Sequence, residues 1–152
     1  MQVSENNVRT SIRFVWASPQ KLDDVWRVQE QSDLKHPHPK SYYEEALRYD
    51  RLLLAYDDDM PVALLCFEVL WGNTPFFALV KVLNEYQRKG IGKSMIKLLE
   101  ERLVQLGFTS YVTSSENVNE KTKRLFPDLG FVRIGELQMA HGGEIFYLKK
   151  LT

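Results

Sequence analysis

The segment from Val80 to Lys93 requires a strand, a tight turn and a helix start in direct succession. It is written VKVLNEYQRKGIGK. Val80 and Val82 favour a strand, and the apolar residues after the segment recur at helical spacing as far as Leu106. Between the strand and the helix, polar residues end the strand and two glycines favour a tight turn. The segment therefore places a helix start at the end of a strand.

A turn of this kind predicts a phosphate site. The first N–H groups of a helix have no partner within it, and the helix dipole adds partial positive charge at the same point. Together they favour a phosphate or pyrophosphate. Gly90 and Gly92 let a ligand approach the backbone closely because no Cβ stands in the way, and Arg88, Lys89 and Lys93 add charge. We call residues 87–93 the phosphate cradle.

Three kinds of phosphate-binding loop compete for this segment. A nucleotide P-loop needs G-x-x-x-x-G-K-[ST], and its first glycine is missing here. A dinucleotide fold needs G-x-G-x-x-G, of which only Gly90-Ile91-Gly92 is present. The third pattern, Q/R-x-x-G-x-G/A, is matched at every defined position by Gln87 to Gly92. The third kind of loop therefore fits best.

The rest of the chain predicts an alternation of strands and helices in the order β-α-α-β-β-β-α-β-α-β-β. Ser18 and Pro19 open the first helix, and Tyr42 to Tyr49 form the second. Asn117 or Asn119 caps the last helix, which runs through Phe126. The predicted strands are Ser11–Ala17, Arg51–Tyr56, Val62–Leu70, Pro75–Leu83, Thr109–Ser114, Val132–Met139 and Glu144–Lys149.

The cradle and the element order resemble the GNAT superfamily of acyl-CoA-dependent N-acetyltransferases. A second motif supports the resemblance, because the segment from Asn119 to Phe131 is similar to the family's N-x-x-A-x-x-L-Y-x-x-L-G-F. The resemblance implies an α/β fold of the α+β type. Its central, mostly antiparallel mixed sheet has about seven strands and about four flanking helices, with strands that splay apart at the coenzyme site.

The resemblance also implies acetyl-CoA as acyl donor, with no metal. In the family the cradle backbone binds the pyrophosphate, and the pantetheine arm pairs with the strand before it. Carried over by motif, the coenzyme-binding residues are Val80, Val82, Gln87, Arg88, Lys89, Gly90, Ile91, Gly92, Lys93, Asn119 and Phe126.

The catalytic acid departs from the family pattern. Many members carry a tyrosine near the coenzyme sulfur at the position of Phe126, and phenylalanine has no proton to donate. We expect its ring to pack near the coenzyme arm, and the following Pro127 to kink or end the helix. Protonation of the thiolate then falls to water, to another side chain or to the product ammonium.

The general base is open among several residues. Glu68 lies on the strand before the predicted turn at Trp71, with a solvent-facing position favoured. His36 and His38 lie in a proline-rich loop, which the resemblance places on the acceptor side, and His141 lies in a glycine turn between the last two strands, from which it could approach the acceptor pocket. Histidines in such loops are more often solvated.

Length, charge and cysteine content limit the domain count, the classes of partner and the compartment. The 152 residues suit a single domain, 1–152, and 20 basic residues balance 20 acidic ones, so the net charge indicates neither nucleic acid nor an acidic surface as partner. No apolar run approaches the about 20 residues that a membrane span needs, so no membrane is indicated. The single Cys66 cannot form an internal disulfide and indicates a buried residue in a reducing cytoplasm.

The activity expected from the resemblance is acetyl transfer to a primary amine by direct attack, with an acceptor that the sequence leaves unspecified. A catalytically weak acyl-CoA-binding or sensor module is the alternative. Because late strands of this fold often pair between subunits, a homodimer is the expected assembly.

Overall fold

The structure is a computed structural model and describes residues 11–32 and 37–152. The strands are β1 (Ile12–Trp16), β2 (Leu52–Asp57), β3 (Met60–Leu70), β4 (Thr74–Val82), β5 (Ser110–Glu116), β6 (Val132–Met139) and β7 (Gly142–Lys150). The helices are α1 (Leu22–Glu30), α2 (Lys40–Arg48), α3 (Ile91–Gln105) and α4 (Glu120–Asp128), with short 3₁₀ turns η1 (Pro19–Lys21) and η2 (Asn84–Tyr86). The predicted element order is confirmed.

The seven strands form one mixed sheet in the order β1-β2-β3-β4-β5-β7-β6. The pair β4–β5 is parallel, and the pairs β1–β2, β2–β3, β5–β7 and β6–β7 are antiparallel. The expected α/β fold, with a mostly antiparallel mixed sheet and four helices, is therefore confirmed. The ladder between β4 and β5 joins Phe76 to Val112 and Phe77 to Thr113. The expected splay of strands at the coenzyme stays a prediction.

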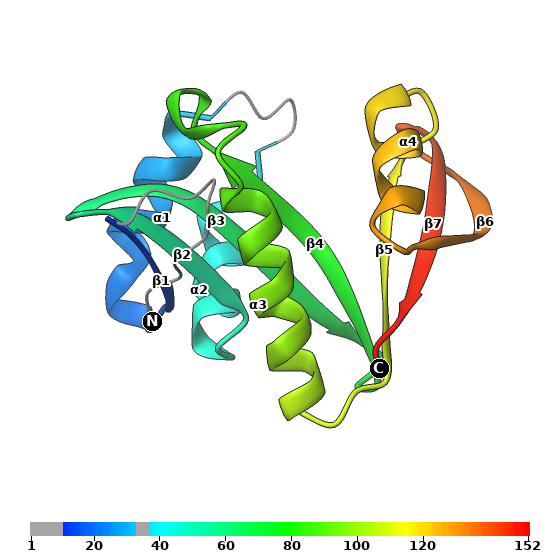
Figure 1. Cartoon of the computed structure of the whole chain (residues 1–152), viewed down its shortest axis with the longest axis horizontal. Coiled ribbons are helices and arrows are strands. Elements are labelled where there is room, and N and C mark those ends of the chain that lie inside the picture. The colour runs from blue at the N-terminus through cyan, green and yellow to red at the C-terminus, as the bar shows by residue number, and fades with distance from the viewer. Residues whose placement is uncertain (1–10, 33–36) are drawn as a thin grey trace. The chain divides into compact units, whose positions relative to one another are not determined.

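Contacts divide the chain into two compact units. Unit 1 comprises Met1–Phe67 with Leu79–Leu99, and unit 2 comprises Glu68–Ala78 with Glu100–Thr152. In unit 1, helices α1 and α2 pack beside strands β2 and β3 (Figure 1) around an apolar cluster. The core of this cluster includes Val25, Tyr43, Leu47, Leu54, Leu64 and Cys66. Cys66 is fully buried, as predicted.

Unit 2 has an aromatic core beneath α4. The Phe126 ring lies 5.4 Å from Phe131 and 5.1 Å from Tyr147, and Tyr111 lies 5.2 Å from Phe131. The hydroxyl of Thr113 donates a hydrogen bond of 2.9 Å to the carbonyl of Phe77, which ties β5 to the first part of β4. Helix α4 includes Pro127 and ends one residue later, as that proline led us to expect.

Two residues next to the turns have surroundings that the sequence does not reveal. Asp57 is the last residue of β2 and accepts hydrogen bonds from Ser11 and Tyr86 at 2.8 and 2.7 Å. Trp71 is not a core residue, because it lies in a turn at φ 54° with 86% of its surface exposed. Isolated apolar residues do not reveal their burial when a hairpin places them at its tip.

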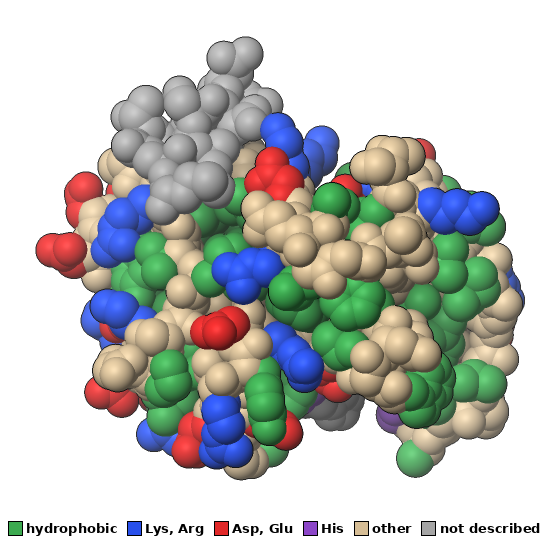
Figure 2. Space-filling view, turned by 90° about the horizontal axis from the view of Figure 1, so that it is seen from below, with side chains coloured by type: hydrophobic (Ala, Val, Ile, Leu, Met, Phe, Trp, Pro, Cys, Tyr) green, Lys and Arg blue, Asp and Glu red, His purple; other side chains and the backbone are tan. Residues whose placement is uncertain are grey.

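The surface carries mixed charge. On the face that Figure 2 shows, basic and acidic side chains are interspersed, in keeping with the balanced composition. None of the helices in the described part of the chain is long and apolar enough to cross a membrane.

Candidate coenzyme site and catalytic residues

The phosphate cradle adopts the backbone that its sequence predicts. Arg88 and Gly90 have φ of 62° and 83°, in the left-handed region that reverses the chain within a few residues. Helix α3 begins at Ile91, and its first turn closes where the amide of Ser94 donates to the carbonyl of Gly90 at 3.0 Å. The amides of Ile91, Gly92 and Lys93 therefore occupy the first three helical positions, which have no acceptor within the helix.

Side chains and backbone hold the cradle on the end of β4. The Gln87 amide donates to the Val82 carbonyl at 3.0 Å and to the Asn84 side-chain oxygen at 3.2 Å. The amide of Leu83 donates to the carbonyl of Val62 on β3 at 2.9 Å. The Gln87 side chain thus fixes the turn, a role that its position in the motif did not predict.

The hydroxyl of Tyr86 connects η2 to β2. It donates to Asp57, which also accepts from Ser11 near the start of β1. A hydrogen bond to a carboxylate is about twice as strong as one between neutral groups. These hydrogen bonds therefore anchor the segment before the cradle to β2 and to the start of β1.

There is space beside the backbone of Gly92, in the first turn of α3. A Cβ built there meets only the Val82 side chain, at 4.0 Å, which is an ordinary van der Waals contact. Arg88 and Lys93 are exposed and Lys89 is half-buried, so three cations surround the turn. A bound pyrophosphate would be held by the amides at the start of α3 and by these cations.

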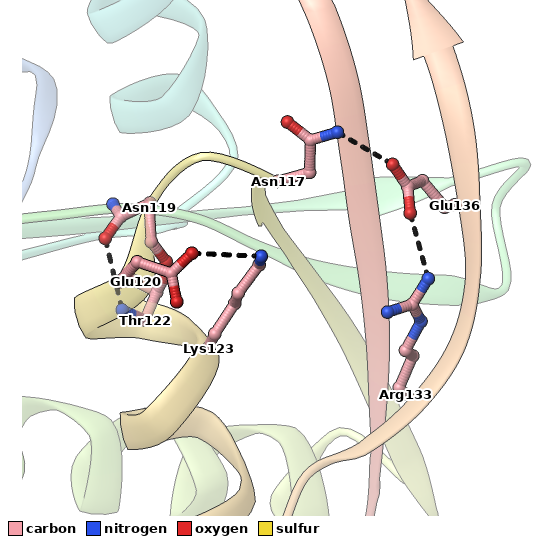
Figure 3. Close-up of polar contacts among 7 residues, drawn as sticks. All are labelled: Asn117, Asn119, Glu120, Thr122, Lys123, Arg133 and Glu136. Atoms are coloured by element: carbon pink, nitrogen blue, oxygen red, sulfur yellow. Dashed lines mark hydrogen bonds and ion pairs between the residues drawn. The ribbon is translucent and has the colours of Figure 1, made fainter.

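The other predicted coenzyme residues have structural contacts of their own. Val80 and Val82 are half-buried on β4. Asn119 lies in unit 2 and caps α4, where its side-chain oxygen accepts from the amide of Thr122 at 3.1 Å (Figure 3). Phe126 is 8% exposed and packs within the aromatic core. That these residues also contact the coenzyme stays a prediction.

The predicted base candidates lie on different elements of the chain. His36 lies outside the described residues. His38 stacks on Tyr42, with ring centroids 4.1 Å apart, in unit 1. Glu68 is half-buried on β3 and His141 lies in the turn before Glu144, both in unit 2.

The surroundings of three tyrosines raise their pKa. Burial raises the pKa of Tyr43, and the charge of Cys66 adds to the effect. Burial, followed by a hydrogen bond to Asp24, raises the pKa of Tyr56. Burial, followed by a hydrogen bond to Glu100, raises the pKa of Tyr111. A neutral phenol at these sites donates a hydrogen bond and holds its proton at neutral pH.

The structure adds a cluster that the sequence analysis missed. Glu144 on β7 accepts a hydrogen bond of 2.8 Å from the Ser114 hydroxyl on β5, and its other oxygen lies 2.9 Å from His141 Nε2. The pairing register of β5 with β7 would have revealed the cluster, but the two strands are separated by a helix and a further strand. Among the described residues no group of three or more potential ligands is arranged to hold a metal ion.

Comparison with solved structures finds the same fold. A GNAT-family acetyltransferase of Listeria monocytogenes matches with a TM-score of 0.82 and 11% identity, over 99% of this chain and 100% of that one. The ribosomal-protein-S18-alanine N-acetyltransferase of Escherichia coli gives 0.79 and 14%, over 93% and 94%. The NatC complex bound to Gag peptide and CoA gives 0.79 and 14%, over 93% and 99%.

A search of the curated proteins finds no match. The family model described as "Acetyltransferase (GNAT) family" matches residues 20–131, which include the cradle and all of α1, α2, α3 and α4. The chain therefore belongs to the GNAT family of acetyltransferases.

Proposed function

We propose that this protein transfers an acetyl group from acetyl-CoA to a primary amine by direct attack within a ternary complex. The observation that carries the proposal is the cradle, where the free amides at the start of α3 coincide with Arg88, Lys89 and Lys93. Its strand–turn–helix geometry suits a pyrophosphate. The family match and the CoA bound to the structurally similar NatC complex support acetyl-CoA as the donor.

The reaction needs three events. The acceptor ammonium loses a proton, its nitrogen attacks the thioester carbonyl carbon, and the carbon–sulfur bond breaks as the coenzyme leaves as a thiolate that takes up a proton. Positioning of two bound substrates supplies much of the rate. Phe126 cannot protonate the thiolate.

We propose a peptide N-terminus as the first acceptor class to test. The similar proteins include one named for an N-terminal ribosomal alanine and one bound to a peptide. An α-amino group has a pKa of about 7.7–8.0, so a substantial fraction is already a free amine at neutral pH. Lysine side chains, polyamines and aminoglycosides form the comparison set.

The test combines coenzyme binding with turnover. Calorimetry should show saturable binding of acetyl-CoA, and a thiol-reactive dye should show coenzyme release that depends on an added amine. Gly92→Asp places a negative charge at the helix start and should abolish binding. Unchanged binding in this variant would mean that the cradle is not the pyrophosphate site.

A coenzyme-binding module of low activity is the second candidate. The absence of a hydroxyl at Phe126 favours it, because the family's usual acid is missing. Tight binding of acetyl-CoA without thiol release across the whole amine panel would support this candidate over the enzyme.

We also propose a homodimer formed through β6. This strand ends the sheet order and exposes four large apolar side chains, Val132, Ile134, Leu137 and Met139, by 41–66%. Exposed sheet edges with apolar side chains favour pairing with another strand. Sedimentation equilibrium should give twice the monomer mass, and Leu137→Lys should return the protein to monomers.

A further inference from the structure

The cradle contains a residue in an unfavourable backbone conformation. Arg88 has φ of 62°, in the left-handed region that a residue with a Cβ adopts only at a cost in free energy. Such conformations persist where the surrounding structure holds them, and they gather at ligand sites. Gly90, at φ 83°, adopts the same region without that cost. The contacts on either side of Arg88 therefore decide whether the cradle keeps the shape that suits a pyrophosphate.

The chain after Arg88 is held by helix α3. The Ser94 amide donates to the Gly90 carbonyl at 3.0 Å, which closes the first helical turn. Ile91 and Met95 anchor this end of the helix in the core, with 1% and 0% of their surfaces exposed. Burial of two large apolar side chains stabilises their positions strongly. The core therefore fixes the downstream end of the cradle.

The chain before Arg88 has less support of this kind. It is the turn η2, three residues long and without a buried residue, in which the Tyr86 amide donates to the Leu83 carbonyl at 2.8 Å. Hydrogen bonds of a 3₁₀ turn have poorer geometry than those of an α-helix. Because η2 is so short, its backbone alone holds the upstream end of the cradle weakly, and side-chain contacts must supply the rest.

Tyr86 supplies a contact from η2 to the strands of unit 1. Its hydroxyl donates to one carboxylate oxygen of Asp57 at 2.7 Å, and the other oxygen accepts from the Ser11 hydroxyl at 2.8 Å. Asp57 pairs with Ile12 on β1 and with Met60 on β3, so its backbone is held on both sides. Hydrogen bonds to a carboxylate are among the stronger ones. All of these residues belong to unit 1, as does the cradle.

We propose that Tyr86 and Asp57 are positioning residues of the coenzyme site, and that their hydrogen bond holds the cradle in the conformation that binds the pyrophosphate. The inference rests on the proposed function. Tyr86 lies two positions before Arg88, so a shift of Tyr86 moves the start of the turn. The apparent Kd of a ligand equals its intrinsic Kd divided by the fraction of protein in the binding conformation. Loss of the hydrogen bond lets Arg88 relax, which lowers that fraction and raises the Kd.

The experiment compares Tyr86→Phe with the matched control Tyr56→Phe. Tyr56 precedes Asp57 on β2, and its hydroxyl donates to the Asp24 carboxylate at 2.6 Å. Each substitution removes one hydrogen bond between a phenol and a carboxylate in unit 1 and keeps the ring. Both variants should lose stability in urea unfolding, because each loses a hydrogen bond to a charged group. Only Tyr86→Phe should raise the Kd for acetyl-CoA measured by calorimetry, by about tenfold if the cradle is then competent about one-tenth of the time.

A shortened donor gives a readout that general loosening of the fold would not produce. S-Acetylpantetheine carries the same thioester as acetyl-CoA but lacks the pyrophosphate, so it makes no use of the cradle. In Tyr86→Phe we expect kcat/KM with acetyl-CoA to fall by about tenfold. The kcat at saturating acetyl-CoA and the kcat/KM with S-acetylpantetheine should both stay at the wild-type value.

Asp57→Asn tests the acceptor side of the same hydrogen bond. Asparagine keeps an oxygen that accepts from Tyr86 but carries no charge, and a hydrogen bond between neutral groups is about half as strong. The Kd for acetyl-CoA should therefore rise by about threefold, which lies between wild type and Tyr86→Phe.

The outcomes separate this inference from the proposed function. A wild-type Kd in folded Tyr86→Phe, or equal rises in Kd in Tyr86→Phe and Tyr56→Phe, would overturn the positioning role and leave the acetyltransferase proposal standing. No binding of acetyl-CoA by the wild-type protein would overturn both. Should Tyr86→Phe unfold, Asp57→Asn decides, and a wild-type Kd in that variant would overturn the positioning role.

Discussion

Gly92→Ala separates folding from coenzyme binding at a single methyl group. The added Cβ lies 4.0 Å from the Val82 side chain, a distance that the fold accepts without movement. Gly92 has no positive φ and lies in the first turn of α3. Replacing glycine by alanine at a compatible helical position stabilises a protein by about 0.4–1 kcal/mol. For a chain of this size, that corresponds to a rise in Tm of roughly 1–4 °C.

Coenzyme binding should respond in the opposite direction. The methyl group occupies space beside the amides that we propose bind the pyrophosphate, where glycine allows a ligand to approach the backbone closely. We expect the Kd for acetyl-CoA to rise by about tenfold or more, which is about 1.4 kcal/mol. Calorimetry measures the Kd, and thermal unfolding without ligand measures the stability.

A matched control is Gly135→Ala on β6. Its Cβ would have no atom within 4 Å, and its φ is not in the left-handed region. This variant should leave the Kd unchanged. A Gly92→Ala protein that is stable and binds acetyl-CoA as tightly as wild type would refute the placement of the pyrophosphate at the start of α3.

Three further predictions concern side-chain contacts that stabilise the fold. The pKa of Tyr111 is raised in the folded protein, so its contribution to folding stability is complete below about pH 10, the ordinary pKa of tyrosine, and is lost as the pH rises through the folded value. Tyr111→Phe should therefore reduce the loss of unfolding free energy at alkaline pH, measured by urea unfolding between pH 8 and 11. Gly143→Ala should cost about 1–3 kcal/mol through the clash with Asn117, and the cost should shrink in an Asn117→Ala background; an unchanged cost would show that the contact is not responsible. Tyr86→Phe removes the hydrogen bond to Asp57 and should cost about 1.5 kcal/mol or more in urea unfolding, while Tyr49→Phe on an exposed tyrosine should cost nothing measurable.

The sequence alone was sufficient for the fold and the cradle because both depend on local chemistry. Hydrophobic periodicity and glycine placement act over a few residues, so the element order and the helix start at Ile91 were predictable. The same kind of signal offered Asn117 or Asn119 as the cap of α4, and the structure shows that Asn119 is the cap. Strand ends were less certain, and β5 extends two residues beyond its predicted end at Ser114.

Tertiary structure decided which side chains meet. Ser114 and Glu144 are 30 positions apart, and their contact depends on the register of β5 with β7, in which a shift of one residue would turn Glu144 to the opposite face. The tether from Tyr86 to Asp57 likewise joins segments 29 positions apart. A sequence pattern specifies the period of each strand, but the side chains that face each other across strands are set only when the strands pair.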